Sequence, residues 1–116
     1  MRAQTLLQRI RDILVDARGQ DMCTLDVEQF TDITDYMIIV SGTSTRHVLS
    51  MADKVIEEMR EQGRRPLGLE GREVGEWILI DFGDVVIHLM RPQTRRFYNL
   101  EKLWGGAEAP EGAAEV

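Results

Sequence analysis

The chain has 116 residues, of which 43% are hydrophobic and 29% are charged, and its formal net charge at pH 7 is −6. This length and composition are typical of one soluble globular domain. Acids outnumber bases and lysine is scarce, which argues against a nucleic-acid interface, because such an interface needs clustered Lys and Arg. An acidic chain is better suited to a basic protein partner.

The sequence also argues against membranes and disulfides. No run approaches the roughly 18 apolar residues that cross a bilayer, and the N-terminus lacks the apolar segment of a signal peptide. The single cysteine, Cys23, lies in an apolar strand pattern, where we expect it to be buried. We therefore expect a cytoplasmic protein without a membrane segment.

Hydrophobic periodicity predicts alternating helices and strands. The expected elements are a helix over residues 2–18, strands over 21–27 and 36–40, a helix from about 44 to 61, a short edge strand or extended loop over 66–70, a hairpin over 77–90 and a helix over 93–104. This order predicts an α/β (α+β) fold, a mixed β-sheet packed by helices. Residues 1–104 would form the domain, and residues 105–116 a disordered acidic tail.

The most informative stretch is the hairpin, in which two apolar runs flank a turn sequence, DFGD over residues 81–84. A two-residue turn at Phe82-Gly83 would pair Trp77 with His88, whereas a three-residue turn would change the pairs but keep Trp77, Leu79 and Asp81 on one face. One hairpin face is wholly aliphatic and is expected in the core: Ile78, Ile80, Val85, Ile87 and Leu89. The other face is mixed, and either the last helix covers it or a partner does: Trp77, Leu79, Asp81, Asp84, Val86, His88 and Met90.

The turn Gly42-Thr43-Ser44 is the best catalytic candidate, because free N–H groups at a helix start can bind an anion. Nucleotidyltransferases hold a triphosphate with such a turn, but they also need two carboxylates for metal ions, usually as Asp-x-Asp. The next strand region offers Glu70 and Glu73 instead. A Ser/Thr-rich turn is also how an ordinary helix begins, so we expect no enzyme.

Metal-ligand spacing is missing as well. The acids Glu28, Asp32 and Asp35 do not follow a calcium-loop pattern. The two histidines and Cys23 lie in three different expected elements, which fits no zinc pattern. We expect no metal, no cofactor and no catalytic residue.

Four stretches carry a more specific signal: DYMIIVSGTSTRHV over residues 35–48, LEG over 69–71, WILIDFGDVVIH over 77–88 and RFYNLEKLW over 96–104. In this order and with this spacing they resemble the ribosomal silencing factor family, also called the Iojap-like family. The resemblance extends over nearly all of residues 1–104.

The resemblance implies a relative of the nucleotidyltransferase fold without the catalytic carboxylates. It further implies a protein, often a homodimer when free, that binds the large ribosomal subunit through its fourteenth ribosomal protein, with little direct RNA contact. Such a protein blocks joining of the small subunit and lowers translation under nutrient limitation. The alternatives are a nucleotidyltransferase-like enzyme that uses the Gly42–Ser44 turn and a dimeric adaptor for another basic protein. For the docking surface we predict seven residues: Trp77, Leu79, Asp81, Asp84, His88, Met90 and Tyr98.

Overall fold

The computed structural model describes residues 2–103. Its elements in chain order are α1 (Ala3–Asp16), β1 (Gln20–Asp26), β2 (Tyr36–Ser41), α2 (Thr45–Glu61), β3 (Gly68–Glu70), β4 (Trp77–Asp81), β5 (Val85–Met90), α3 (Pro92–Tyr98) and α4 (Leu100–Leu103). The expected tail over residues 105–116 and Trp104 lie outside the described residues.

The five strands form one mixed sheet in the order β1-β2-β5-β4-β3. β2 and β5 are parallel, and the other neighbouring pairs are antiparallel. β1 and β3 are therefore the edge strands, and β3 lies within the segment over residues 66–70 for which an edge position was predicted. The predicted fold class is confirmed.

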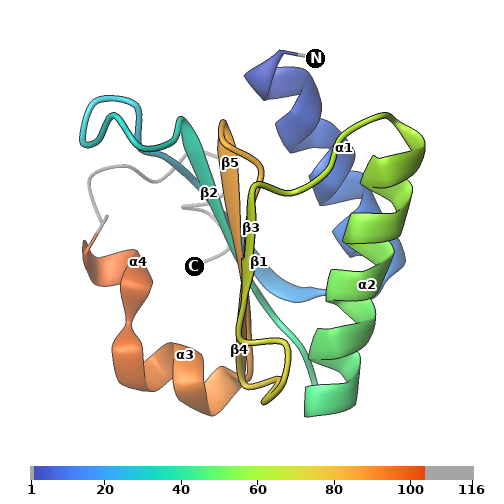
Figure 1. Cartoon of the computed structure of the whole chain (residues 1–116). Coiled ribbons are helices and arrows are strands. Elements are labelled where there is room, and N and C mark those ends of the chain that lie inside the picture. The colour runs from blue at the N-terminus through green and yellow to red at the C-terminus, as the bar shows by residue number, and fades with distance from the viewer. Residues whose placement is uncertain (1, 104–116) are drawn as a thin grey trace.

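The helices form a layer on each face of the sheet. Figure 1 shows α1 and α2 side by side on one face, and α3 and α4 on the other. The predicted aliphatic face of the hairpin is wholly buried beneath α1 and α2, where it joins the stripes of both helices in the main core. A smaller cluster lies on the opposite face: Cys23, Leu25, Val27, Ile39 and Met90. None of the helices described is long and apolar enough to cross a membrane.

The hairpin turn lies one residue later than predicted. The Phe82 N–H donates to the Val85 carbonyl (2.9 Å), so the two-residue loop is Gly83-Asp84. The aromatic ring explains the shift, since Phe82 is buried in the main core and cannot occupy an exposed turn. Gly83 adopts φ +89°, a conformation that glycine accepts at little cost.

Moving the turn by one residue moves every cross-strand partner by two. Trp77 now lies opposite Met90, and Leu79 opposite His88. Because side chains alternate with a period of two, the two faces of the hairpin keep their predicted composition.

The predicted helix ends need two corrections. The first helix, predicted over residues 2–18, ends at Asp16, and Arg18 adopts the positive φ (+64°) that a glycine often takes after a helix end. Gly19 is needed for space instead, since a Cβ there would lie 2.7 Å from a Val40 methyl carbon. The predicted helix over 93–104 is broken at Asn99, whose φ of +50° separates α3 from α4.

One polar position of β1 differs from its expected environment. Thr24 alternates with the apolar Cys23 and Leu25 along β1, a pattern that favours a solvent-facing position, but it is 1% exposed. Its hydroxyl accepts a hydrogen bond from the Arg11 guanidinium of α1, which satisfies the buried oxygen and lets the long arginine cover this part of the sheet.

Candidate docking surface

Three aromatic rings form a row where the mixed face of the hairpin meets α3. The Trp77 and Tyr98 rings are 4.9 Å apart between centroids, and the Tyr98 and Phe97 rings are 5.0 Å apart in an edge-to-face arrangement. Exposure increases along the row, from the half-buried Trp77 to Tyr98 at 53% and Phe97 at 81%. Rings this exposed are available to a partner, and large rigid rings are typical anchors of protein interfaces.

Trp77 is fixed from below by a buried histidine. Its indole N–H donates to Nδ1 of His88 at 3.0 Å, and the two ring centroids are 5.9 Å apart. Burial lowers the pKa of His88 from its ordinary 6.5 to about 4, because the charged imidazolium loses its hydration. At neutral pH His88 is therefore uncharged, which leaves Nδ1 free to accept the bond.

The other predicted residues lie at different depths. Leu79 and Asp81 are half-buried, and Asp84 is exposed at the hairpin loop. Met90 has no exposed surface and His88 is 6% exposed, so both lie beneath the surface and support it from below. We use the name hairpin surface for the accessible set Trp77, Leu79, Asp81, Phe97 and Tyr98.

The rim of the hairpin surface is acidic. Glu70 lies opposite Leu79 in the sheet, Asp81 ends β4, and Asp84 lies in the hairpin loop. One oxygen of Asp81 accepts the Gly83 N–H at 2.7 Å. Across residues 2–103, none of these three acids takes part in an ion pair. Their uncompensated charge favours a basic partner.

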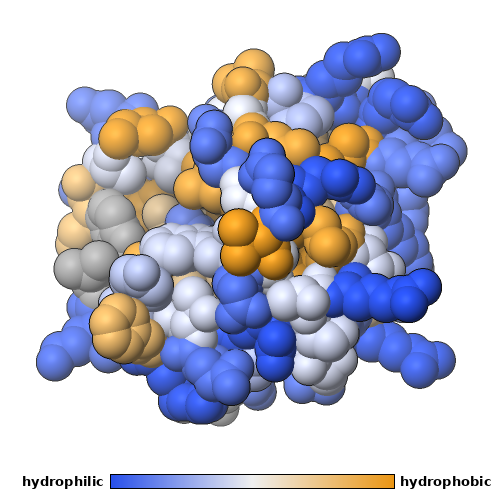
Figure 2. Space-filling model, turned by 60° about the horizontal axis from the view of Figure 1, so that its bottom comes forward, coloured by the Kyte–Doolittle hydropathy of each residue, from blue (hydrophilic) through white to orange (hydrophobic). Residues whose placement is uncertain are grey.

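Hydrophobic side chains reach the outside in small groups. In the face drawn in Figure 2 they are separate orange patches between hydrophilic side chains. Docking on such a surface depends on a few anchors and on charge, not on one broad apolar patch.

A nearly buried ion pair joins α3 to α4. Arg95 is 8% exposed, and its Nε and Nη2 donate to one oxygen of Glu101 at 3.1 and 2.8 Å. Nη1 donates to the Ser41 hydroxyl at the end of β2 (2.9 Å). These bonds tie the short α4 to α3 and α3 to the sheet, and so fix the helix that carries Phe97 and Tyr98.

A second set of polar contacts ties the start of α3 to the start of β4. The Arg91 N–H donates to the Glu76 carbonyl at 3.0 Å, and its guanidinium pairs with the Glu76 carboxylate at 3.5 Å. These contacts hold α3 and β4, the two elements that carry the hairpin surface, together at one end.

The Gly42–Ser44 turn uses its polar groups within the chain. The Gly42 N–H donates to the Met90 carbonyl at 3.0 Å, and the Thr43 N–H donates to His47 Nδ1 at 2.9 Å. Ser44 is the N-cap of α2, accepting the His47 N–H at 3.0 Å. His47 Nε2 lies 2.8 Å from the Ala17 carbonyl and so links α2 to the end of α1. This is the geometry of a helix start fastened to its neighbours.

The acidic connection between β1 and β2 contains no metal-binding group. Within residues 2–103, no three His, Cys, Asp or Glu side chains are grouped to hold an ion. The pKa of Glu28 is raised, chiefly by the neighbouring charge of Asp26. Repulsion of this kind fits a solvated acidic loop.

Two residues of this region were not predicted from sequence. Phe97 lies within the helix predicted over residues 93–104 and was not among the predicted docking residues, but it is exposed in α3, before the break at Asn99. Arg95 was not singled out, because nothing local identifies a partner 54 positions away, at Ser41. The one available signal was the arginine pair Arg95-Arg96 directly before the aromatic pair Phe97-Tyr98.

The fold and this surface define a class, an α+β mixed-sheet protein with an aromatic, acid-edged face suited to docking. A comparison with known families identifies it further. The family described as ribosomal silencing factor during starvation matches residues 1–115. The chain belongs to this family, whose description indicates a regulatory role at the ribosome.

Individual relatives of the chain support the same family assignment. The chain is 40% identical to a ribosomal silencing factor of Chromobacterium violaceum, over 91% of this chain and 87% of that protein. It is 39% identical to the mouse protein named mitochondrial assembly of ribosomal large subunit protein 1, over 79% of this chain and 42% of that protein. A crystal structure of a Chromobacterium violaceum protein superposes with a TM-score of 0.89 at 38% identity, covering 95% of this chain and 91% of that one.

Proposed function

We propose that this protein is a translational repressor that binds the large ribosomal subunit through its fourteenth ribosomal protein and sterically blocks joining of the small subunit. Family membership supports the ribosome as target, and the name of the mouse relative points to the large subunit. The family resemblance supplies the fourteenth ribosomal protein as the docking site.

The aromatic row on the hairpin surface carries this proposal. Tyr98 and Phe97 are the exposed anchors, and Trp77 forms the inner end of the row. Leu79 and Asp81 extend the contact along β4, and Asp84 adds charge at the loop. His88 and Met90 act from beneath by holding Trp77 and closing the small cluster. Ribosomal proteins are basic, so the acidic rim favours approach and orientation.

Steric occlusion needs no catalyst or cofactor. A domain of this size, with a radius of gyration of 12.9 Å, is large enough to prevent two surfaces from meeting when it docks on one of them. The repressor would act in the cytoplasm, lower translation when nutrients are limiting and form a homodimer when free.

Binding and subunit joining are tested together. Purified protein is sedimented with isolated large subunits, and joining to small subunits is followed by light scattering. We expect the protein to pellet with large subunits and to slow joining in proportion to its occupancy. Failure to cosediment, or cosedimentation without any effect on joining, would contradict the proposal.

A further inference from the structure

A polar cavity of about 370 Å³ lies between β1, the end of β2 and the two C-terminal helices. Its lining residues are Asp21, Ser41, Pro92, Arg95, Arg96, Asn99 and Glu101. The volume falls at the small end of the roughly 300–1,000 Å³ that is typical of small-molecule sites.

The cavity has a favourable place in the fold. Ser41 ends β2 and Pro92 follows β5, and these are the two parallel strands of the sheet. Open α/β sheets bind ligands beyond the carboxyl ends of their parallel strands, where the following segments diverge. The polar lining of the cavity therefore lies where sheets of this type bind their ligands.

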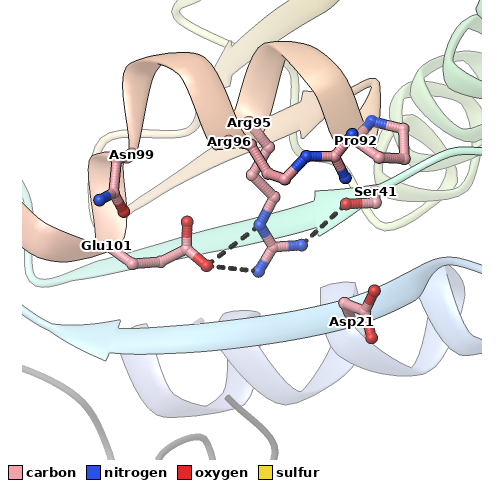
Figure 3. Close-up of a pocket in the computed structure, with 7 residues that line it drawn as sticks. All are labelled: Asp21, Ser41, Pro92, Arg95, Arg96, Asn99 and Glu101. Atoms are coloured by element: carbon pink, nitrogen blue, oxygen red, sulfur yellow. Dashed lines mark hydrogen bonds and ion pairs between the residues drawn. The ribbon is translucent and has the colours of Figure 1, made fainter.

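Arg95 keeps donor capacity in the cavity. A guanidinium has five N–H bonds. Three of them are used by Glu101 and Ser41, which leaves one on Nη1 and one on Nη2 within the described part of the chain. Figure 3 shows the guanidinium between those two partners, with Asp21 on the neighbouring strand β1 beyond it. Two such N–H bonds form a fork that matches the two oxygens of a carboxylate.

Two carboxylates also line the cavity. One oxygen of Glu101 takes both bonds from Arg95, and the other oxygen accepts none within residues 2–103. The Asp21 carboxylate has no hydrogen bond or ion pair there, and the residue adopts φ +51° where the register of β1 shifts. Asp21 therefore offers a carboxylate to an ammonium group on the far side of the Arg95 guanidinium from Glu101 (Figure 3).

The charges of the lining cancel. Two arginines, Arg95 and Arg96, stand against two carboxylates, Asp21 and Glu101. A ligand that is only an anion would be repelled by both acids, and a ligand that is only a cation would be repelled by both arginines. A small molecule with both charges meets a partner for each, and its own net charge of zero matches the lining.

We propose that this cavity binds a free α-amino acid. Its carboxylate lies on the fork of Arg95 beside Ser41, and its ammonium group lies against the Asp21 carboxylate. Arg95 thus has a second role besides holding α4, since its remaining N–H groups bind the carboxylate end of the ligand. This site is separate from the hairpin surface, and its test does not depend on ribosome binding.

The test is a titration of the full chain, followed by NMR of its backbone amides. The probes are L-alanine, L-serine, L-glutamine and L-leucine, each added singly. The comparison compounds are acetate, methylammonium and inorganic phosphate. We expect at least one amino acid to shift the amides of Ser41, Asn99 and Glu101 saturably, and to bind about ten-fold or more tightly than each comparison compound.

A conservative variant removes one charge without disturbing the backbone. Asn accepts positive φ as Asp does, so Asp21→Asn should fold normally. We expect it to lose about ten-fold or more in amino-acid affinity, while the matched control Asp32→Asn, on the exposed loop, binds as the wild type does. The proposal is overturned if no amino acid binds saturably, if acetate or phosphate binds as tightly, or if Asp21→Asn retains full affinity.

Discussion

Acidification tests the buried contact between Trp77 and His88. The pKa of His88 is about 4 in the folded chain and 6.5 when unperturbed, so between these values the unfolded chain binds more protons. The contribution of neutral His88 to the free energy of unfolding is fully present above about pH 6.5 and is lost as the pH falls toward 4. The difference of about 2.5 pKa units, at 1.36 kcal/mol per unit, corresponds to about 3 kcal/mol.

The assay is urea unfolding of the wild type and of His88→Asn at a series of pH values from about 7.5 to about 4. Asn does not titrate, and its side-chain oxygen can accept the indole N–H of Trp77 in place of Nδ1. Carboxylates titrate alike in both proteins, so the difference between the two curves isolates His88. We expect the wild type to lose about 3 kcal/mol more than the variant. Parallel curves would refute the assignment of a neutral, desolvated histidine beneath Trp77.

Two further predictions concern the elements that position the hairpin surface. Gly71 has φ +86°, and a Cβ there would overlap the Trp77 carbonyl oxygen, so Gly71→Ala should cost about 2 kcal/mol or more in urea unfolding. Gly63→Ala is the control, because it has a similar φ with nothing nearby, and a cost equal to that of Gly71→Ala would contradict the close approach. Glu101→Gln leaves Arg95 nearly buried without its counter-charge and should cost about 3 kcal/mol, while Lys102→Gln on the same helix should cost less than about 0.5 kcal/mol. Equal unfolding midpoints for these two variants would show that the ion pair does not hold α4.

Local sequence pattern predicted most of the sheet and its main core. The aliphatic face of residues 77–90 could be assigned because strand periodicity is independent of the turn position. An error of one residue in the turn therefore changed the partners of Trp77 but not its face. The N-cap Ser44 was also predictable, because a cap is specified by the residues beside it.

The contacts that shape the hairpin surface could not be predicted in this way. The break at Asn99 needs a left-handed residue within an otherwise helical pattern, and no glycine marks it. The bond from Trp77 to His88 depends on the register of two strands, and the bond from Arg95 to Ser41 joins distant segments. Sequence alone could place Trp77 on the mixed face, but not decide between a covered and an accessible position; the structure shows it half-buried, with its indole N–H satisfied.

Because Trp77 is half-buried, Tyr98 is a more specific residue than Trp77 with which to test the proposed function. Truncating Trp77 would leave the acceptor of His88 unpaired and would lower stability together with binding. Tyr98 is 53% exposed, so its removal should change the free energy of unfolding little. Val15, on α1 at the opposite face of the sheet, is 62% exposed and provides a matched control.

The most direct measurement is the affinity of Tyr98→Ala and Val15→Ala for the purified fourteenth protein of the large ribosomal subunit. We expect Tyr98→Ala to bind about ten-fold or more weakly than the wild type with its thermal midpoint nearly unchanged, and Val15→Ala to bind as the wild type does. If Tyr98→Ala retains wild-type affinity, the hairpin surface is not where this protein docks.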